Sequence, residues 1–190
     1  ESVGLTAAAD RRVGGYSKGM RQRLGLAQAL LGDPRVLLLD EPTTGLDPAL
    51  RNSFYDIVEG LRARGATVLL SSHALTELEG KADRVIIVNQ GIKIADGTID
   101  ELRGIARLPT RIRVRLADGD LASENIWPGE AFGWRRVNGR SFEIDAAPEE
   151  KIGVLRKATS AGAPVADIDV LPPTLDELYA HFLGQQETVQ

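Results

Sequence analysis

The sequence contains no cysteine, which excludes disulfide bonds and thiolate metal sites. It has only two histidines, His73 and His181, which lie far apart in the chain, so a zinc site built from histidines is not expected. No apolar run approaches the roughly 20 residues that a membrane-spanning helix needs. The net charge of −4 comes without a basic run, which argues against nucleic acid as the main partner.

The composition that is present is typical of globular proteins, with 43% hydrophobic and 26% charged residues. A chain of 190 residues is long enough for one medium domain or two small ones, with a sizeable core. No signal peptide is recognisable at its start. We therefore expect an ordered cytoplasmic protein that can dock on a membrane partner.

The most informative stretch is 36–42, Val-Leu-Leu-Leu-Asp-Glu-Pro, in which four apolar residues precede two acids. A continuous apolar run fits a strand buried on both faces of a parallel sheet. The carboxyl ends of such strands are where open α/β sheets hold their ligands. Asp40 can hold Mg²⁺ there, directly or through water, and Glu41 can polarise an attacking water. The alternative is that the two acids simply cap a strand in solvent.

A second strand is expected to bring a histidine to the same place. A helix is predicted over 49–64, with Asp47 as its N-cap. The following apolar run, 66–73, predicts another buried strand that ends in His73. Strand, helix and strand in this order predict a parallel pair, so His73 is expected at the same sheet edge as the two acids. A lone histidine at a strand end is more often structural, but here it converges with two carboxylates.

Upstream of these strands, an amphipathic helix is predicted from the helical spacing of Leu24, Ala27 or Gln28, and Leu31. Ser17 is the expected N-cap of this helix, and Gly19 follows closely. A serine hydroxyl, a nearby glycine and the free amides of a helix N-terminus together favour an anion site. An ordinary capped helix is the alternative interpretation.

After the second strand, further short elements are predicted up to about residue 105. They are a helix at 75–81, a hairpin of 84–88 and 91–95 that turns at Asn89-Gln90, and a helix opened by the capping box 98–101.

The pattern changes near Pro109, where a half-exposed strand alternates arginines with apolar residues over 111–116. A hairpin follows, and only a three-residue loop, 138–140, puts its four large apolar residues on one face. Those four residues are Phe132, Trp134, Phe142 and Ile144.

The last elements predicted are a helix over 149–161, a strand over 165–171 and a final helix that runs from the capping box 174–177 to Leu183. The inward-facing residues expected on the first of these helices are Ile152, Leu155 and Ala158. The order β-ββ-α-β-α predicts a small α+β domain.

Four motifs now stand in one order: Ser-x-Gly at a helix start, an apolar strand ending Asp-Glu, a Gly-Leu-Asp-Pro loop and a strand ending in histidine. In this order they resemble the second half of the nucleotide-binding domain of an ABC transporter. Residues 16–20 resemble its signature motif, 36–41 its Walker B strand, 45–48 its D-loop and His73 its switch histidine. The fold class that this implies is α/β, a partial P-loop NTPase (RecA-like) parallel sheet core. The core would span 1–105, with a small C-terminal α+β accessory domain at 106–190.

The resemblance implies an ATPase with ATP and Mg²⁺ as cofactors. Asp40 would serve Mg²⁺, Glu41 would orient or activate the hydrolytic water, and His73 would contact the γ-phosphate. Ser17 and Gly19 would reach the γ-phosphate of ATP held by a second copy of the chain. That copy would complete a head-to-tail ATP sandwich dimer.

Three more nucleotide-site residues are carried over from the same family. The commonest signature has Gly-Gly-Gln where this chain has Lys18-Gly19-Met20, so Lys18 adds a positive charge near the phosphates and Met20 stands where the family has glutamine. Asp47 would lie at the dimer seam and couple the two sites. The family also implies transmembrane permease subunits as partners and a peripheral place on the cytoplasmic side of the inner membrane.

The sequence lacks three other parts of that family. It has no G-x-x-x-x-G-K-[ST] phosphate loop, no aromatic adenine stacker and no Gln-loop, all of which are expected before residue 1. We therefore expect that the chain is a fragment and that these 190 residues alone do not turn over ATP.

Residues 109–190 resemble the accessory domain of prokaryotic exporter ATPases, including the Pro-x-Leu-Asp-Glu helix start at 173–177. Within the family, 16–20 and 179–183 are most similar to the ATPase of the copper-site maturation transporter for nitrous oxide reductase. Two alternatives are a catalytically silent regulatory or dimerisation module and a soluble, non-transport ABC ATPase. Glu41 and His73 argue against the first, and the lack of a long coiled coil or basic linker argues against the second.

Overall fold

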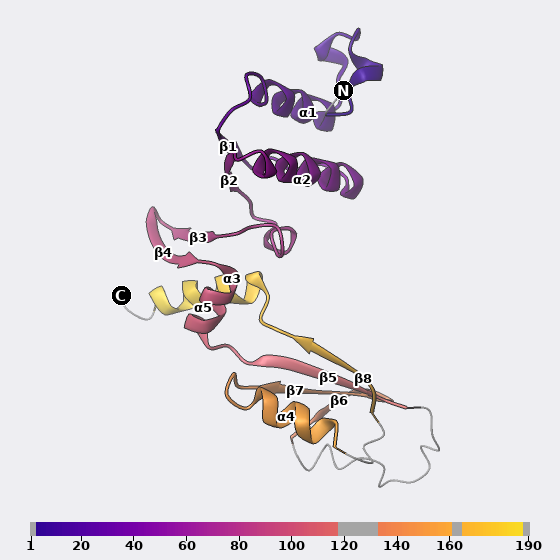
Figure 1. The fold of residues 1–190 in the computed structure, drawn as a ribbon, viewed down its shortest axis with the longest axis vertical. Coiled ribbons are helices and arrows are strands. Elements are labelled where there is room, and N and C mark those ends of the chain that lie inside the picture. The colour runs from indigo at the N-terminus through magenta and orange to yellow at the C-terminus, as the bar shows by residue number, and fades with distance from the viewer. Residues whose placement is uncertain (1–2, 118–132, 161–164, 188–190) are drawn as a thin grey trace. The chain divides into compact units, whose positions relative to one another are not determined.

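The computed structural model describes residues 3–117, 133–160 and 165–187 (Figure 1). The chain divides into two compact units, Glu1–Leu75 and Thr76–Gln190. This division comes earlier in the chain than the predicted domain boundary at 105–106. Within the described ranges, no helix is both long enough and apolar enough to span a bilayer.

The first unit is built around one pair of parallel strands. Its elements are η1 (Thr6–Ala8), η2 (Val13–Gly15), α1 (Lys18–Ala29), β1 (Val36–Asp40), α2 (Pro48–Ala63) and β2 (Thr67–Ser71). The two strands run in register from Val36 opposite Thr67 to Asp40 opposite Ser71, which confirms the predicted strand–helix–strand arrangement. The Asp47 carboxylate accepts a hydrogen bond of 3.0 Å from the Leu50 amide, so Asp47 is the N-cap of α2, as predicted.

The prediction that β1 is buried on both faces is wrong. Leu37 is only 3% exposed, whereas Val36 and Leu38 are 62% and 74% exposed. Leu69, on the neighbouring strand β2, is 57% exposed. Among the described residues of this unit, α1 and α2 line the space on one side of β1, and no second layer covers the other side.

The buried face of α1 also differs from the prediction. Ser17 caps the helix as expected, because its Oγ accepts a hydrogen bond of 3.2 Å from the Met20 amide. The buried residue is Leu26, at 8% exposure, whereas Leu24 and Leu31 are 36% and 77% exposed. Because α1 ends at Ala29, Leu31 lies beyond the helix and cannot share its face.

Two of the predicted elements after β2 need correction. The helix expected over 75–81 is a single turn, η3 (Leu75–Glu77), and Gly80 follows with a φ of +74° that a helix cannot continue. The hairpin of β3 (Val85–Asn89) and β4 (Ile92–Gly97) is present. Its turn is Gln90-Gly91 rather than Asn89-Gln90, and both turn residues have positive φ, as a tight hairpin requires.

Helix α3 (Ile99–Ala106) begins at the predicted capping box. The Thr98 amide donates to Glu101 Oε2 at 2.8 Å, and the Glu101 amide donates to Thr98 Oγ1 at 3.1 Å. This helix packs against α5 (Leu175–Glu187). The residues between them include Leu102 and Leu178, both fully buried.

The C-terminal part has the predicted order β-ββ-α-β-α. Its elements are β5 (Thr110–Leu116), β6 (Arg135–Asn138), β7 (Ser141–Ala146), α4 (Lys151–Ala158), β8 (Val165–Leu171) and α5. The strands form one antiparallel sheet in the order β6-β7-β5-β8. Ile112 and Val114 on β5 are fully buried in a core that includes Ala158 of α4. The predicted alternation of β5 is therefore confirmed.

The hairpin of β6 and β7 places its described large apolar residues on one face, as predicted, but its loop is not the predicted three-residue loop. Asn138 pairs with Ser141, so the loop holds only Gly139 and Arg140. A register shift between Arg136 and Asn138 replaces the third loop residue. Trp134 and Phe142 consequently share one core and are 7% and 4% exposed, with Ile144 packed against it. Phe132 lies outside the described residues.

Helix α4 turns a different face inward from the one predicted. Ala158 is buried and Leu155 packs on the core, but Ile152 is 62% exposed. Val154 takes its place because it stands four residues before Ala158 and so lies on the same helical face.

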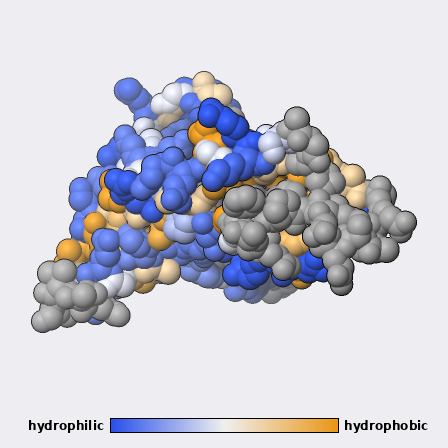
Figure 2. Space-filling view, turned by 90° about the horizontal axis from the view of Figure 1, so that it is seen from below, coloured by the Kyte–Doolittle hydropathy of each residue, from blue (hydrophilic) through white to orange (hydrophobic). Residues whose placement is uncertain are grey.

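The other face of the sheet is covered by charges, and we call it the charged face. Its ion-paired members are Arg111, Arg113, Arg115, Arg135, Glu143, Asp145 and Asp167. Figure 2 shows one side of the molecule, on which hydrophilic residues dominate and hydrophobic ones are scattered among them. Scattered apolar residues of this kind are normal for a protein surface.

Candidate functional site

The parallel pairing of β1 and β2 brings the predicted acids and histidine to one sheet edge. Asp40 is the last residue of β1, and Glu41 follows it. His73 follows the end of β2, and its Nδ1 lies 2.8 Å from Glu41 Oε2. The predicted juxtaposition of Asp40, Glu41 and His73 is therefore present in the structure.

The backbone of Glu41 adopts a conformation that residues with a side chain rarely take. Its φ is +46°, in the left-handed region. Such conformations persist where the surroundings hold them, and they cluster at functional sites. One of the groups that hold it is the hydroxyl of Ser71, which accepts a hydrogen bond of 3.0 Å from the Glu41 amide.

The Glu41 carboxylate is charged and partly open to solvent. Thr44 Oγ1 donates to Glu41 Oε2 at 3.0 Å, the same oxygen that His73 reaches. The hydrogen bond from His73 holds the pKa of Glu41 below its usual value, and Thr44 acts in the same direction, against burial and the charge of Asp40. The side chains of Glu41 and His73 are 38% and 75% exposed, so a ligand can approach them.

Asp40 supplies the hard oxygen atoms that Mg²⁺ prefers. Ser71 Oγ donates to Asp40 Oδ1 at 2.5 Å, and within the described ranges no hydrogen bond reaches Oδ2. Those ranges contain no cluster of three or more metal-binding side chains. Mg²⁺ does not need such a cluster, because it is commonly held by one or two carboxylates together with substrate phosphates and water. Asp40 fits that mode of binding.

The start of α1 forms a second group of predicted site residues. Ser17 is exposed, and because its oxygen accepts the Met20 amide, its hydroxyl proton remains available to a ligand. Lys18 lies over Gly45, whose φ is +79°; a Cβ built there would be 3.0 Å from Lys18 Nζ. A Cβ on Gly19 would meet Leu46 Cδ2 at 3.4 Å, so the helix start packs closely on the loop before α2.

The structure does not join these two groups directly. Among the described residues, the hydrogen bonds and ion pairs of Asp40, Glu41 and His73 involve none of the residues at the start of α1. One side chain further along α1 does connect them, because Gln22 Nε2 donates to the carbonyls of Glu41 at 3.2 Å and Pro42 at 2.5 Å.

Three residues of the site were missed by sequence reasoning: Ser71, Thr44 and Gln22. Ser71 had a recognisable signal, because the parallel register places the polar end of β2 beside Asp40. Thr44 and Gln22 had none, since a single hydroxyl in a loop and a single amide on a helix are common in any sequence.

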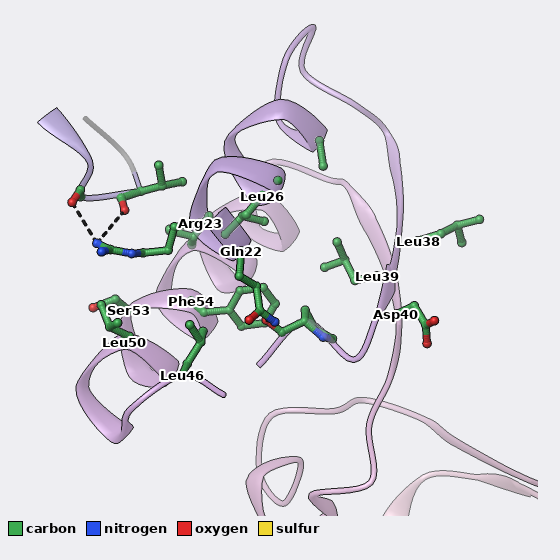
Figure 3. Close-up of a pocket in the computed structure, with 16 residues that line it drawn as sticks. Gln22, Arg23, Leu26, Leu38, Leu39, Asp40, Leu46, Leu50, Ser53 and Phe54 are labelled. Atoms are coloured by element: carbon green, nitrogen blue, oxygen red, sulfur yellow. Dashed lines mark hydrogen bonds between the residues drawn. The ribbon is translucent and has the colours of Figure 1, made fainter. Parts of the chain in front are cut away.

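A cavity of about 550 Å³ lies beside this site (Figure 3). Its apolar lining includes Leu26, Leu39 and Phe54, whereas Glu41 and His73 do not line it. Figure 3 shows Leu39 pointing toward α1 and α2, and the side chain of Asp40 pointing away to the other side of the strand. Glu41 therefore acts outside this cavity, whereas Asp40 belongs to its lining.

The chain is similar over its whole length to ATP-binding proteins. It is 38% identical over 200 residues to the daunorubicin resistance ATP-binding protein DrrA3 of Streptomyces coeruleorubidus, covering 100% of this chain and 61% of that protein. It is 36% identical over 189 residues to the Nod factor export ATP-binding protein I of Bradyrhizobium diazoefficiens, covering 98% and 59%. It is 43% identical over 188 residues to the daunorubicin/doxorubicin resistance ATP-binding protein DrrA of Streptomyces peucetius, covering 97% and 57%.

Family and fold comparisons agree with these relatives. Residues 6–79 match the family described as AAA domain, putative AbiEii toxin, Type IV TA system. A crystal structure of a nucleotide-free ATP-binding cassette from an ABC transporter is similar with a TM-score of 0.50 and 26% identity, covering 55% of this chain and 42% of that one. The predicted α/β fold class of the P-loop NTPases is therefore confirmed. The chain spans about three fifths of the length of the relatives named above, and these matches support its assignment to the ATP-binding subunits of ABC transporters.

Proposed function

We propose that the protein carrying this sequence hydrolyses ATP to drive a membrane transporter. The observation that carries the proposal is the contact of 2.8 Å between His73 and Glu41, beside Asp40, at the carboxyl ends of two parallel strands. Ligands of open α/β sheets bind at that end. The proposal assigns the nucleotide chemistry to residues 1–105 and an accessory role to 106–190.

Glu41 is proposed to orient the water that attacks the terminal phosphoryl group. His73 and Thr44 both bond to Oε2, which leaves Oε1 to accept a hydrogen bond from that water. Because its pKa is lowered, Glu41 is ionised at neutral pH and is a weak base. Its contribution is therefore to hold and aim the water, while the imidazole of His73 fixes the carboxylate and is placed to contact the γ-phosphate.

Asp40 is proposed to serve Mg²⁺ through Oδ2, directly or through water. When bound, the ion neutralises phosphate charge that would otherwise repel the two acids. The work of the protein is to keep the Asp40 carboxylate oriented, through the hydrogen bond from Ser71.

The start of α1 is proposed to bind the γ-phosphate of ATP held by a second copy of the chain. Ser17 offers a free hydroxyl proton, Lys18 a charge, and Gly19 a backbone amide of the first helical turn, where anions are favoured. Met20, whose own amide donates to Ser17 Oγ, is proposed to lie beside the nucleotide. Asp47 caps α2 and directly follows the loop that Lys18 contacts. This position is consistent with the proposal that Asp47 lies in the interface of a head-to-tail dimer.

Transmembrane permease subunits are the proposed partners, with the protein on the cytoplasmic face of the inner membrane. The names of the relatives, which refer to daunorubicin resistance and Nod factor export, favour an exporter. The narrower interpretation, maturation of a copper enzyme, rests on residues 16–20 and 179–183 and stays a prediction.

A Glu41→Gln variant of the whole ATP-binding subunit tests the proposal. We expect ATP hydrolysis to fall by a factor of about 100 or more, because the amide no longer aims the water. We also expect ATP-bound dimers to accumulate, measured by size-exclusion chromatography with light scattering. Glu59→Gln is the matched control, because Glu59 is exposed on α2, where it pairs with Arg62 of the same helix.

The alternatives give different results in the same experiment. A silent regulatory module shows no hydrolysis before the change and no response to it. A soluble, non-transport ATPase shows the loss of hydrolysis, but its activity does not respond to permease subunits in vesicles. We further expect the 190 residues alone to show no Mg-ATP hydrolysis, and measurable turnover by them would refute that expectation.

A further inference from the structure

Ser71 makes two hydrogen bonds across the strand pair with a single hydroxyl. Its oxygen accepts from the Glu41 amide at 3.0 Å, and its proton goes to Asp40 Oδ1 at 2.5 Å. Ser71 stands opposite Asp40 in the parallel register, so the pairing of β1 and β2 itself sets this arrangement. The hydroxyl has only one proton to donate, so its orientation is fixed.

We propose that Ser71 is a positioning residue for ATP hydrolysis that orients both acids at once. This inference rests on the function proposed above. The hydrogen bond to Oδ1 holds the Asp40 carboxylate in one orientation, from which Oδ2 would be the oxygen left to hold a cation. The hydrogen bond from the amide supports the left-handed backbone of Glu41, and that backbone carries the Glu41 side chain to His73.

The surroundings favour a positioning role over a purely structural one. Ser71 and Asp40 are both exposed, and exposed polar contacts contribute little to folding stability. The strand pair is already held by five successive residue pairs of backbone register, which do not depend on the side chain. The next serine along the chain, Ser72, differs: its Oγ accepts a hydrogen bond of 3.0 Å from the nearby Ala74 amide, a local contact that does not cross the strand pair.

The test compares Ser71→Ala, which removes the hydroxyl, with Ser71→Thr, which keeps it and suits a strand. Ser53→Ala is the control, because the Ser53 hydroxyl donates to the Ala49 carbonyl of its own helix, at 3.1 Å. In the whole ATP-binding subunit, we expect Ser71→Ala to lower kcat about tenfold, about 1.4 kcal/mol in the barrier. The KM for ATP should stay within about twofold, as for groups that act mainly in the transition state. Ser71→Thr should keep kcat near that of the parent.

A second measurement does not depend on turnover. Mn²⁺ replaces Mg²⁺ as a paramagnetic probe, and its binding with a non-hydrolysable ATP analogue is followed by electron paramagnetic resonance. We expect Ser71→Ala to weaken Mn²⁺ binding about tenfold, the lower end of the usual effect for a group that orients a metal ligand. Binding of the analogue without metal should not change.

The outcomes separate this inference from the proposed function. If the parent is active and Ser71→Ala keeps both kcat and Mn²⁺ affinity within about twofold, the inference alone is overturned. A change of about twofold is smaller than the cost of losing one hydrogen bond to a charged group. A Ser71→Ala protein that loses its circular dichroism also overturns it, in favour of a structural role. A parent that hydrolyses no ATP in the presence of its permease overturns the proposed function, and the inference falls with it.

Discussion

Acidic residues occur both on the charged face of the C-terminal sheet and at the ends of β1 and β2, but the groups that pair with them differ. On the charged face, Arg113 Nη2 lies 2.5 Å from Glu143 Oε1, and Arg115 Nη2 lies 3.1 Å from Asp167 Oδ2. At the ends of β1 and β2, within the described residues, Glu41 pairs with a histidine and Asp40 with a hydroxyl. An acid paired with arginine is neutralised, whereas the acids at the strand ends keep charge available to a cation or a water.

The apolar surfaces of the two sheets differ in the same way. On β5, Ile112 and Val114 are fully buried beneath α4. On β1, Val36 and Leu38 are more than half exposed. The C-terminal sheet therefore contributes a closed core, while the parallel pair of the first unit offers one open face beside its site.

The largest expected effect on stability comes from replacing an apolar side chain on one of these two strands by alanine. Ile112→Ala should lower the free energy of unfolding of the C-terminal part by about 2–5 kcal/mol, because it leaves a cavity in a closed core. Leu38→Ala should change it by less than about 0.5 kcal/mol, because that side chain is 74% exposed. Denaturant unfolding of the 190-residue chain, followed by circular dichroism, measures both.

A large effect of Leu38→Ala would mean that the open face of β1 is covered in solution. Sedimentation of the parent chain would then show whether a second copy covers it. An Ile112→Ala variant as stable as the parent would mean that the C-terminal core tolerates the cavity by collapsing around it.

The next effect concerns the charged face itself. Glu143 is 8% exposed and accepts hydrogen bonds from Arg113, whereas the Asp167 side chain is 55% exposed. Glu143→Gln should cost about 1.5–3 kcal/mol, the value of hydrogen bonds to a charged group. Asp167→Asn should cost less than about 1 kcal/mol, as expected of an exposed ion pair. Equal costs in denaturant unfolding would show that burial does not distinguish the two pairs.

The same pair predicts a pH dependence. The hydrogen bond from Arg113 holds the pKa of Glu143 below its usual value. Its stabilisation is therefore complete above the pKa of Glu143 in the unfolded chain and is lost as the pH falls through the folded-state pKa. Between pH 7 and pH 3, the parent should lose more stability than Glu143→Gln, measured by unfolding at each pH. A parallel decline of the two proteins would contradict this assignment.

Much of the site was predictable because local chemistry and topology agree there. The apolar run before Asp40, the helix capped by Asp47 and the apolar run before His73 leave only a parallel pairing, which brings the polar strand ends together. The capping boxes at 98–101 and 174–177 were predictable for a similar reason, since each is a local hydrogen-bond pattern.

The predictions that were wrong concern residues whose burial or pairing depends on the element packed against them. The run 36–39 fits a strand covered on both faces, but burial requires a second layer that the described residues of this unit do not supply. The loop of the β6–β7 hairpin and the inward face of α4 were set by a register shift and by the packing of Val154. A single sequence carries no record of either.

The smallest expected effect concerns the link between α1 and the strand end. Gln22 donates to the carbonyls of Glu41 and Pro42, so Gln22→Ala should lower the stability of the first unit by about 0.5–1.5 kcal/mol, the net value of such a hydrogen bond. Gln28→Ala is the matched control, because Gln28 is exposed on the same helix. Its change to alanine raises helix propensity by only a few tenths of a kcal/mol, so its stability should stay close to that of the parent. Hydrogen exchange of the amides at 41–44 reports the effect locally. If these amides exchange no faster in Gln22→Ala than in Gln28→Ala, the strained conformation of Glu41 is held from the strand side alone, by Ser71, and α1 has no part in it.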